Sequence, residues 1–168
     1  MPEVASFREQ ARDYGGWGTL ASTAFDRMIA VTVRAPFLIT QAAASRLRDG
    51  GRVINISSVF AARPSPQALA YSMAKAAVNA MTQAAAAEFG ERGVTVNAIA
   101  PGWTATDANA AARDDPALVA QLAKDTAPGR MAEPADIDGV AGVVSLFASP
   151  EGTWLTGQYV EANGPVPA

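Results

Sequence analysis

The 168-residue sequence contains neither cysteine nor histidine. Without cysteine there can be no disulfide, no thiolate nucleophile and no zinc-thiolate site. Without histidine the chain lacks the usual general base near neutral pH and the commonest metal ligand. We therefore expect no metal site, and any acid/base chemistry must use tyrosine, lysine, aspartate or glutamate.

Charge and long apolar runs are also scarce. Charged residues make up 17% of the chain, the net charge is -3, and Lys and Arg are scattered. No basic stripe suits a phosphate backbone, so nucleic acid is not an expected partner. No segment approaches the roughly 20 apolar residues of a membrane span, and residues 1–10 hold no apolar run. These features favour a cytoplasmic protein that has no membrane partner.

What the sequence does contain is a pattern of alternating elements. Its length and its 49% hydrophobic content predict one domain over residues 1–168. The glycine cluster around Trp17 makes residues 1–23 an irregular lead-in. The spacing of apolar residues predicts a helix over 24–48, kinked at Pro36, and a second helix over 69–88. Shorter helices begin at Pro116 and Pro134.

Three segments rich in β-branched residues predict strands at 52–57, 93–99 and 157–161. Because helices alternate with these strands, the strands should form a parallel sheet joined by right-handed crossovers. The fold class is therefore α/β, with about three parallel strands flanked by helices. Such a small sheet would leave the first strand with an uncovered apolar edge.

The residues that suggest chemistry lie where predicted strands end. Tyr71 and Lys75 are four residues apart on one helix face, and Ser58 follows the first strand, thirteen residues before Tyr71. The next strand leads into Asn97-Ala98-Ile99-Ala100-Pro101-Gly102. The spacing of Tyr71 and Lys75 alone also fits a partly buried tyrosine beside a solvated lysine.

Taken together, these motifs at these distances resemble the short-chain dehydrogenase/reductase family over about residues 25–164. The resemblance implies the catalytic, C-terminal half of a Rossmann-like fold. It implies that Tyr71 exchanges a proton with the substrate oxygen and that Lys75 favours the phenolate. It also implies that Ser58 donates a hydrogen bond to that oxygen, although Ser58 could instead be a strand-end turn hydroxyl. Its neighbour Ser57 should face inward.

The same resemblance implies NAD or NADP as cofactor. Lys75 would also bind the nicotinamide ribose beside Tyr71. The segment from Pro101 to Thr106 resembles the family's Pro-Gly-x-x-x-Thr, which implies that Pro101, Gly102, Thr104 and Thr106 contact the nicotinamide. The two threonines could equally cap turns in a loop. Asn97 is interpreted as a structural residue that steadies the loop near Pro101, and residues 107–124 match the flap over the substrate.

Two features depart from the family. No Gly-x-x-x-Gly-x-Gly turn follows a strand, so the residues that hold adenosine and pyrophosphate are absent from this sequence. By itself the chain should then bind the nucleotide weakly or not at all. Thr32 also stands where the family has an asparagine whose distorted helix and backbone carbonyl support a proton relay. Whether that distortion persists with Thr32 is left open.

Three functions follow as alternatives. The first is an oxidoreductase that interconverts a small-molecule carbonyl and an alcohol, truncated and weak or inactive alone. The second is a cofactor-independent isomerase or cyclase that reuses Ser58, Tyr71 and Lys75. The third is a noncatalytic oligomerisation module, because the two long helices match those through which the family assembles, and we expect a homo-oligomer.

Overall fold

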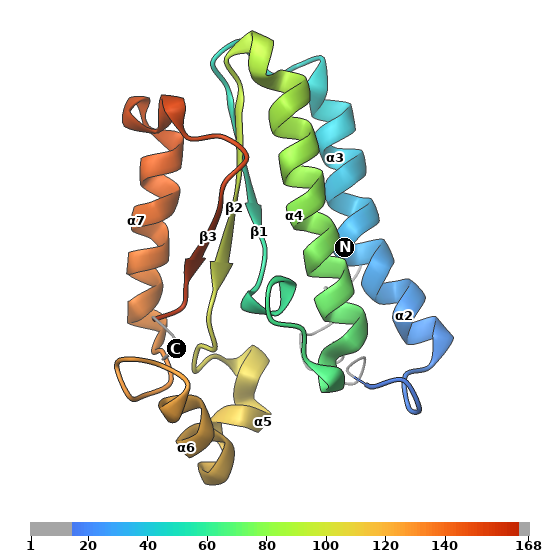
Figure 1. Ribbon diagram of the computed structural model, residues 1–168, viewed down its shortest axis with the longest axis vertical. Helices are drawn as coiled ribbons and strands as arrows, with labels where there is room; N and C mark the ends of the chain where they lie inside the picture. The colour runs from blue at the N-terminus through green and yellow to red at the C-terminus, as the bar shows by residue number, and fades with distance from the viewer. Residues whose placement is uncertain (1–14, 165–168) are drawn as a thin grey trace.

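The computed structural model describes residues 15–164, which form a three-stranded parallel sheet covered by helices on both faces (Figure 1). The strands are β1 (Arg52–Ile56), β2 (Thr95–Pro101) and β3 (Tyr159–Ala162), in the order β1-β2-β3. Both neighbouring pairs are parallel. The predicted α/β class with three parallel strands is confirmed, and the strand ends differ from the predicted ones by one or two residues.

The helices form two layers around this sheet (Figure 1). On one side lies α4 (Leu69–Phe89), with α2 (Ser22–Ile29) and α3 (Ala35–Ala44) alongside it. On the other side lies α7 (Ile137–Ala148). The short helices α5 (Ala110–Arg113) and α6 (Pro116–Lys124) lie beyond the carboxyl ends of the strands. No helix within residues 15–164 is both long and apolar enough to cross a membrane.

The central strand β2 organises the core. Its residues from Thr95 to Ala100 are all buried, as is typical of a parallel strand covered on both faces. Val96 packs with Phe89 of α4 on one side, and Ile99 packs with Phe147 of α7 on the other. Because successive side chains in a strand alternate between faces, one short strand joins both helical layers into a single core.

The first predicted helix needs correction. It is not continuous over 24–48: a π-helical turn, Ala30–Arg34, separates α2 from α3, and α3 ends at Ala44. In this turn the Ala35 amide donates to the Ala30 carbonyl, five residues back. Pro36 has no N–H to donate to the Thr32 carbonyl, so the regular pattern is interrupted before the proline rather than at it. The predicted lead-in also ends two residues early, at residue 21, and its residues 1–14 lie outside the described part.

The sheet has an apolar edge, as the sequence indicated. Within the described residues β1 pairs only with β2, and its outer side has no strand partner. At the end of this strand the side chain of Ile56 is 52% exposed. An unpaired edge with an exposed isoleucine is a surface that further structure ordinarily covers.

Two glycines, one within α7 and one in the turn after it, provide a matched test of how tightly α7 and that turn pack together. A Cβ at Gly152 would lie 2.4 Å from the Leu146 carbonyl oxygen, whereas a Cβ at Gly142 of α7 meets nothing within 4 Å. We expect Gly152→Ala to lower the free energy of unfolding by about 1–3 kcal/mol. Gly142→Ala should raise it by about 0.5–1 kcal/mol, since alanine favours a helix interior. Urea unfolding of both variants measures this, and equal effects would contradict the packing described.

Candidate active site

The carboxyl ends of β1 and β2 bring the predicted catalytic residues together. Ile56 pairs with Ile99, so Ser58 after β1 lies level with the Pro101-Gly102 segment that ends β2. A cavity of about 350 Å³ opens between these ends and α4. Its lining includes five of the residues predicted from the sequence, namely Ser58, Tyr71, Lys75, Pro101 and Gly102.

Polar contacts between β1 and α4 fix the position of the helix that carries Tyr71 and Lys75. The Asn55 amide donates to the Thr82 hydroxyl at 2.8 Å. The Ser57 hydroxyl donates to the Asn79 side-chain oxygen at 2.6 Å, so Ser57 is buried and faces inward as predicted. Because these bonds lie one helical turn apart on the same face of α4, they set both the rotation and the height of the helix.

Ser58 is held in a conformation suited to donation. It precedes a short 3-10 turn, Val59–Ala61, and its hydroxyl oxygen accepts the Phe60 amide at 3.3 Å. With an N–H already at its oxygen, the hydroxyl keeps its hydrogen to donate. On the other side the Tyr159 hydroxyl donates to the Ser58 carbonyl at 2.9 Å, which links this turn to β3.

Tyr71 and Lys75 lie close together, as their spacing predicts. The Lys75 ammonium is 5.5 Å from the centre of the Tyr71 ring and donates to the Ile56 carbonyl at 2.8 Å. Burial raises the pKa of Tyr71 above its usual range, and a hydrogen bond with the Ser58 side chain opposes that rise. Burial also lowers the pKa of Lys75. Both shifts follow from the cost of charge in a partly desolvated cavity.

The direction of the Tyr71 shift has a chemical consequence. Burial, the larger cause, disfavours the phenolate, whereas the hydrogen bond with the Ser58 side chain favours it. The part of Lys75 in favouring the phenolate stays a prediction. In its protonated form the Tyr71 hydroxyl has a proton that it can give to a substrate oxygen.

The two threonines after β2 do not share this cavity. Thr104 is buried, and its hydroxyl donates to the Gly102 carbonyl at 3.2 Å. Its carbonyl accepts from the Thr106 amide at 2.8 Å and from the Asn109 side chain at 2.9 Å. Thr106 is not among the residues that line the cavity, whereas Asn109 is. In the conformation described, the Thr104 hydroxyl makes the local turn contact that was its alternative interpretation, whereas the Thr106 side chain makes no capping hydrogen bond to the turn that follows it. Contact of either threonine with the nicotinamide stays a prediction.

Asn97 has a structural role, but it supports a different loop from the one that the sequence suggested. It is completely buried in β2. Its amide donates to the Leu155 carbonyl at 2.7 Å and its oxygen accepts the Gln158 amide at 3.0 Å. Asn97 therefore steadies the loop that leads into β3 rather than the loop near Pro101.

Thr32 lies within the π-helical turn Ala30–Arg34, so the helix is distorted at the position left open by the sequence. The turn packs beside α4, where Val33 and Tyr71 border the same apolar cluster of Met28, Ala70 and Ala74. The Thr32 hydroxyl contacts the Met28 sulfur at 3.5 Å. The distortion that the family associates with asparagine is thus compatible with threonine at this place.

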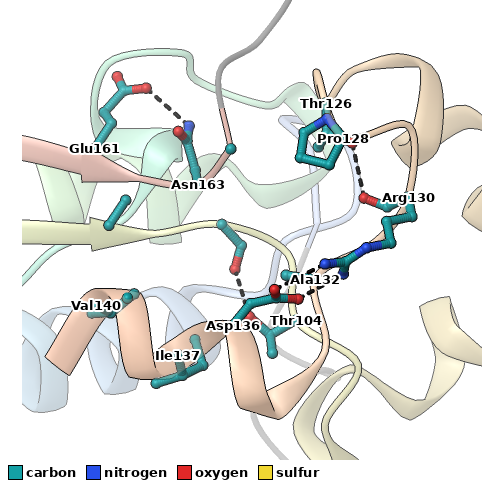
Figure 2. A pocket seen from close by; sticks show the side chains of 14 residues that line it. Thr104, Thr126, Pro128, Arg130, Ala132, Asp136, Ile137, Val140, Glu161 and Asn163 are labelled. Carbon is teal, nitrogen blue, oxygen red and sulfur yellow. Dashed lines mark hydrogen bonds and ion pairs between the residues drawn. The ribbon is translucent and has the colours of Figure 1, made fainter. Parts of the chain in front are cut away.

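A larger cavity of about 550 Å³ lies on the α7 side of Gly102 (Figure 2). An ion pair and a hydrogen bond fix its walls: Arg130 binds Asp136 through two bonds of 2.6 and 2.9 Å, and the Asn163 amide donates to the Glu161 carboxylate at 3.0 Å. The hydrogen bonds from Arg130 and from the Glu133 amide lower the pKa of Asp136 to about 2. These contacts anchor the start of α7 and the end of β3.

Sequence reasoning missed three aromatic residues at the site. Phe60 contacts Tyr71 and Trp103 edge to face, with ring centres 6.2 and 5.8 Å apart. Tyr159 comes from a strand about 100 residues downstream of Ser58 and still binds its carbonyl. Only their nearness to Ser58 and Pro101 along the chain could have indicated Phe60 and Trp103. Nothing in the local pattern indicated Tyr159.

A parallel sheet with a Ser-Tyr-Lys cavity at its carboxyl ends defines the class of Rossmann-like oxidoreductases. The chain matches the family model described as enoyl-(acyl carrier protein) reductase over residues 11–164. It is 37% identical over 147 residues to an uncharacterized oxidoreductase of Methylorubrum extorquens, covering 84% of this chain and 56% of that protein. It is 38% identical over 144 residues to a mouse (3R)-3-hydroxyacyl-CoA dehydrogenase, covering 83% and 53%.

Solved structures agree with this class. The angucycline C-6 ketoreductase LanV with bound NADP superposes with a TM-score of 0.80 at 35% identity, covering 91% of this chain and 58% of that one. The chain belongs to the short-chain dehydrogenase/reductase family. It spans a little more than half the length of the curated relatives that it matches, 56% and 54% in two of them.

The hydrogen bond from Tyr159 to Ser58 predicts a pH-dependent stability. Burial and the nearby Glu161 raise the pKa of Tyr159 to about 12, from 10.0. A raised folded-state pKa contributes stability that is complete below pH 10 and lost between pH 10 and about 12. Tyr159→Phe should therefore lower the free energy of unfolding by about 1–2 kcal/mol at pH 8, because the Ser58 carbonyl loses its donor. The gap between the two proteins should narrow above pH 10.

Urea unfolding of wild type and Tyr159→Phe at intervals from pH 8 to pH 12 measures this gap. Phe147→Leu serves as a control, since it removes a buried ring that packs against Ile99 and Val140, and it should give a difference independent of pH. A Tyr159→Phe gap that stays constant up to pH 12 would contradict the raised pKa of Tyr159.

Proposed function

We propose that this chain carries the carbonyl-binding and proton-transfer part of an NAD(P)H-dependent carbonyl reductase. The observation that carries the proposal is the convergence of Ser58, Tyr71 and Lys75 in one cavity at the carboxyl ends of β1 and β2. The NADP bound to the similar ketoreductase and the name of the mouse dehydrogenase support a carbonyl or alcohol substrate.

In the proposed reduction the substrate oxygen lies between Ser58 and Tyr71. The nicotinamide, when bound, supplies the hydride that adds to the carbonyl carbon. As the C=O double bond opens, negative charge develops on the oxygen, and the Ser58 hydroxyl stabilises it by a hydrogen bond. Tyr71 then gives its phenolic proton to that oxygen, which completes the alcohol.

The residues present fit only one end of the dinucleotide. The Lys75 ammonium has three donors and uses one on the Ile56 carbonyl, so two remain for ribose hydroxyls. Pro101 and Gly102 line the cavity, and their backbone would contact the nicotinamide. No glycine-rich turn that could hold the pyrophosphate occurs in this sequence. Tight binding of NAD or NADP therefore depends on residues beyond this chain.

Replacement of Tyr71 tests the reductase directly. NADPH or NADH oxidation is followed with the purified chain and a saturating carbonyl substrate, and nucleotide binding is titrated in the same buffer. We expect Tyr71→Phe to lower turnover by about 100-fold or more, since the proton donor is lost. Trp154→Phe, at a side chain 95% exposed, should change nothing.

Equal turnover by wild type and Tyr71→Phe would contradict the proposal. Micromolar nucleotide affinity of the chain alone would contradict the account of where the nucleotide is held. If a substrate is converted without nucleotide and Tyr71→Phe abolishes the conversion, the isomerase or cyclase alternative is correct.

We also propose that the chain forms a homo-oligomer through α3 and α4. A groove of about 310 Å³ runs between these helices, lined by Phe37, Ala44, Met81, Ala85 and Phe89 among others. Phe37 is 49% exposed and Ile39 on the same helix is 68% exposed. An apolar groove between paired helices, with a half-exposed phenylalanine at its wall, suits a self-complementary interface.

Native mass spectrometry tests this assembly. The wild-type chain should have at least twice the monomer mass, and Phe37→Glu should shift it to monomer because a buried unpaired carboxylate is costly. Leu146→Glu on α7, at a side chain 44% exposed, is the control and should leave the mass unchanged. A monomeric wild type would overturn the proposal.

A further inference from the structure

A second, smaller cavity adjoins the catalytic one and is not explained by proton transfer. It has a volume of about 210 Å³ and shares Val59, Phe60, Gly102 and Trp103 with the cavity that holds Ser58 and Tyr71. Because the two share these walls, a substrate whose carbonyl lies between Ser58 and Tyr71 would place the rest of its body here.

The walls of this cavity are mainly aromatic and apolar. The Phe60 ring makes edge-to-face contacts with both Trp103 and Tyr71, and these contacts fix its orientation in the wall. At the other end Leu122 of α6 and Met131 contribute side chains that are 8% and 6% exposed. Methionine sulfur makes favourable contacts with aromatic rings and adapts to their outline.

The charges at this cavity do not favour an anionic substrate. The Arg63 guanidinium, the only cation among the described lining residues, forms an ion pair with Glu161. Asn163 donates to the same Glu161 carboxylate (Figure 2). The Asp125 carboxylate, which accepts two hydrogen bonds from the neutral Gln121 side chain at 3.3 Å, adds a negative charge to the lining and would repel a carboxylate or phosphate on the substrate.

From this arrangement, which rests on the reductase proposed above, we propose that the substrate is a neutral, planar aromatic ketone. Its ring occupies the adjoining cavity, here called the aromatic subsite, between Phe60, Trp103, Leu122 and Met131. Rigid rings lose little conformational freedom on binding and pack against aromatic walls, whereas a flexible alkyl chain must be ordered. Phe60 and Trp103 therefore determine specificity, and Leu122 closes the end of the subsite.

The chain offers an internal probe for this site. It has three tryptophans, of which Trp17 and Trp154 are 88% and 95% exposed. In the double variant Trp17→Phe/Trp154→Phe, Trp103 is the sole tryptophan and reports on the aromatic subsite. We expect 1-tetralone, a bicyclic aromatic ketone, to change Trp103 fluorescence with a saturable midpoint on the order of 0.1–1 mM. The ten-carbon aliphatic ketone 2-decanone should bind at least about fivefold more weakly than 1-tetralone.

Two leucines of α6 give a matched pair of variants in that background. Leu122→Ala should weaken tetralone binding about fivefold, since it removes apolar contact with the ring. Leu118→Ala should have no effect, because Leu118 is 37% exposed and does not line the subsite. Phe60→Leu removes an aromatic wall at a less buried position and should weaken tetralone binding without unfolding the chain. A carboxylated tetralone should bind about tenfold more weakly than tetralone itself.

The proposal is overturned if tetralone gives no saturable signal, if decanone binds as tightly, or if Leu118→Ala weakens binding as much as Leu122→Ala. The titration needs neither nucleotide nor turnover, so it is independent of the Tyr71→Phe experiment. Saturable tetralone binding together with equal carbonyl turnover by wild type and Tyr71→Phe would support the aromatic subsite and contradict the reductase. Turnover that Tyr71→Phe abolishes, with no preference for tetralone, would support the reductase and contradict the aromatic subsite.

Discussion

The packing of α4 against the edge strand β1 is the constraint on which the site depends. Two side-chain hydrogen bonds, Asn55 to Thr82 and Ser57 to Asn79, join the strand to the helix. A third contact, from the Lys75 ammonium to the Ile56 carbonyl, lies nearest the cavity. If α4 turned or slid by one residue, every partner on its inner face would change and the Tyr71 hydroxyl would leave Ser58. Polar bonds in an otherwise apolar interface are well suited to fix such a register, because each unpaired group would be costly.

Burial then gives these residues their chemical character. The same desolvation raises the pKa of Tyr71 and lowers that of Lys75. Phe60 contacts both Tyr71 and Trp103, and it thereby links the catalytic cavity to the aromatic subsite. The acidity of the proton donor and the shape of the substrate site thus have one physical origin, the apolar packing after β1 and β2.

The chain spans a little more than half the length of its curated relatives, 56% and 54% in two of them. The outer side of β1 has no strand partner among residues 15–164, and Ile56 is exposed there. The Lys75 ammonium bonds the carbonyl at the end of this same strand. The open edge of the sheet therefore lies next to the group proposed to hold the nicotinamide ribose.

Local sequence determined much of the fold and the catalytic core of the site. The spacing of apolar residues located the long helix α4, and the content of β-branched residues located the three strands, because these signals depend only on neighbouring residues. The spacing of Ser58, Tyr71 and Lys75 predicted one shared cavity, which the structure contains. Tertiary structure alone decided the placement of Asn97 against the loop before β3. It also brought Tyr159 to Ser58 from about 100 residues away. Such contacts follow from how layers pack across the sheet, which no local pattern encodes.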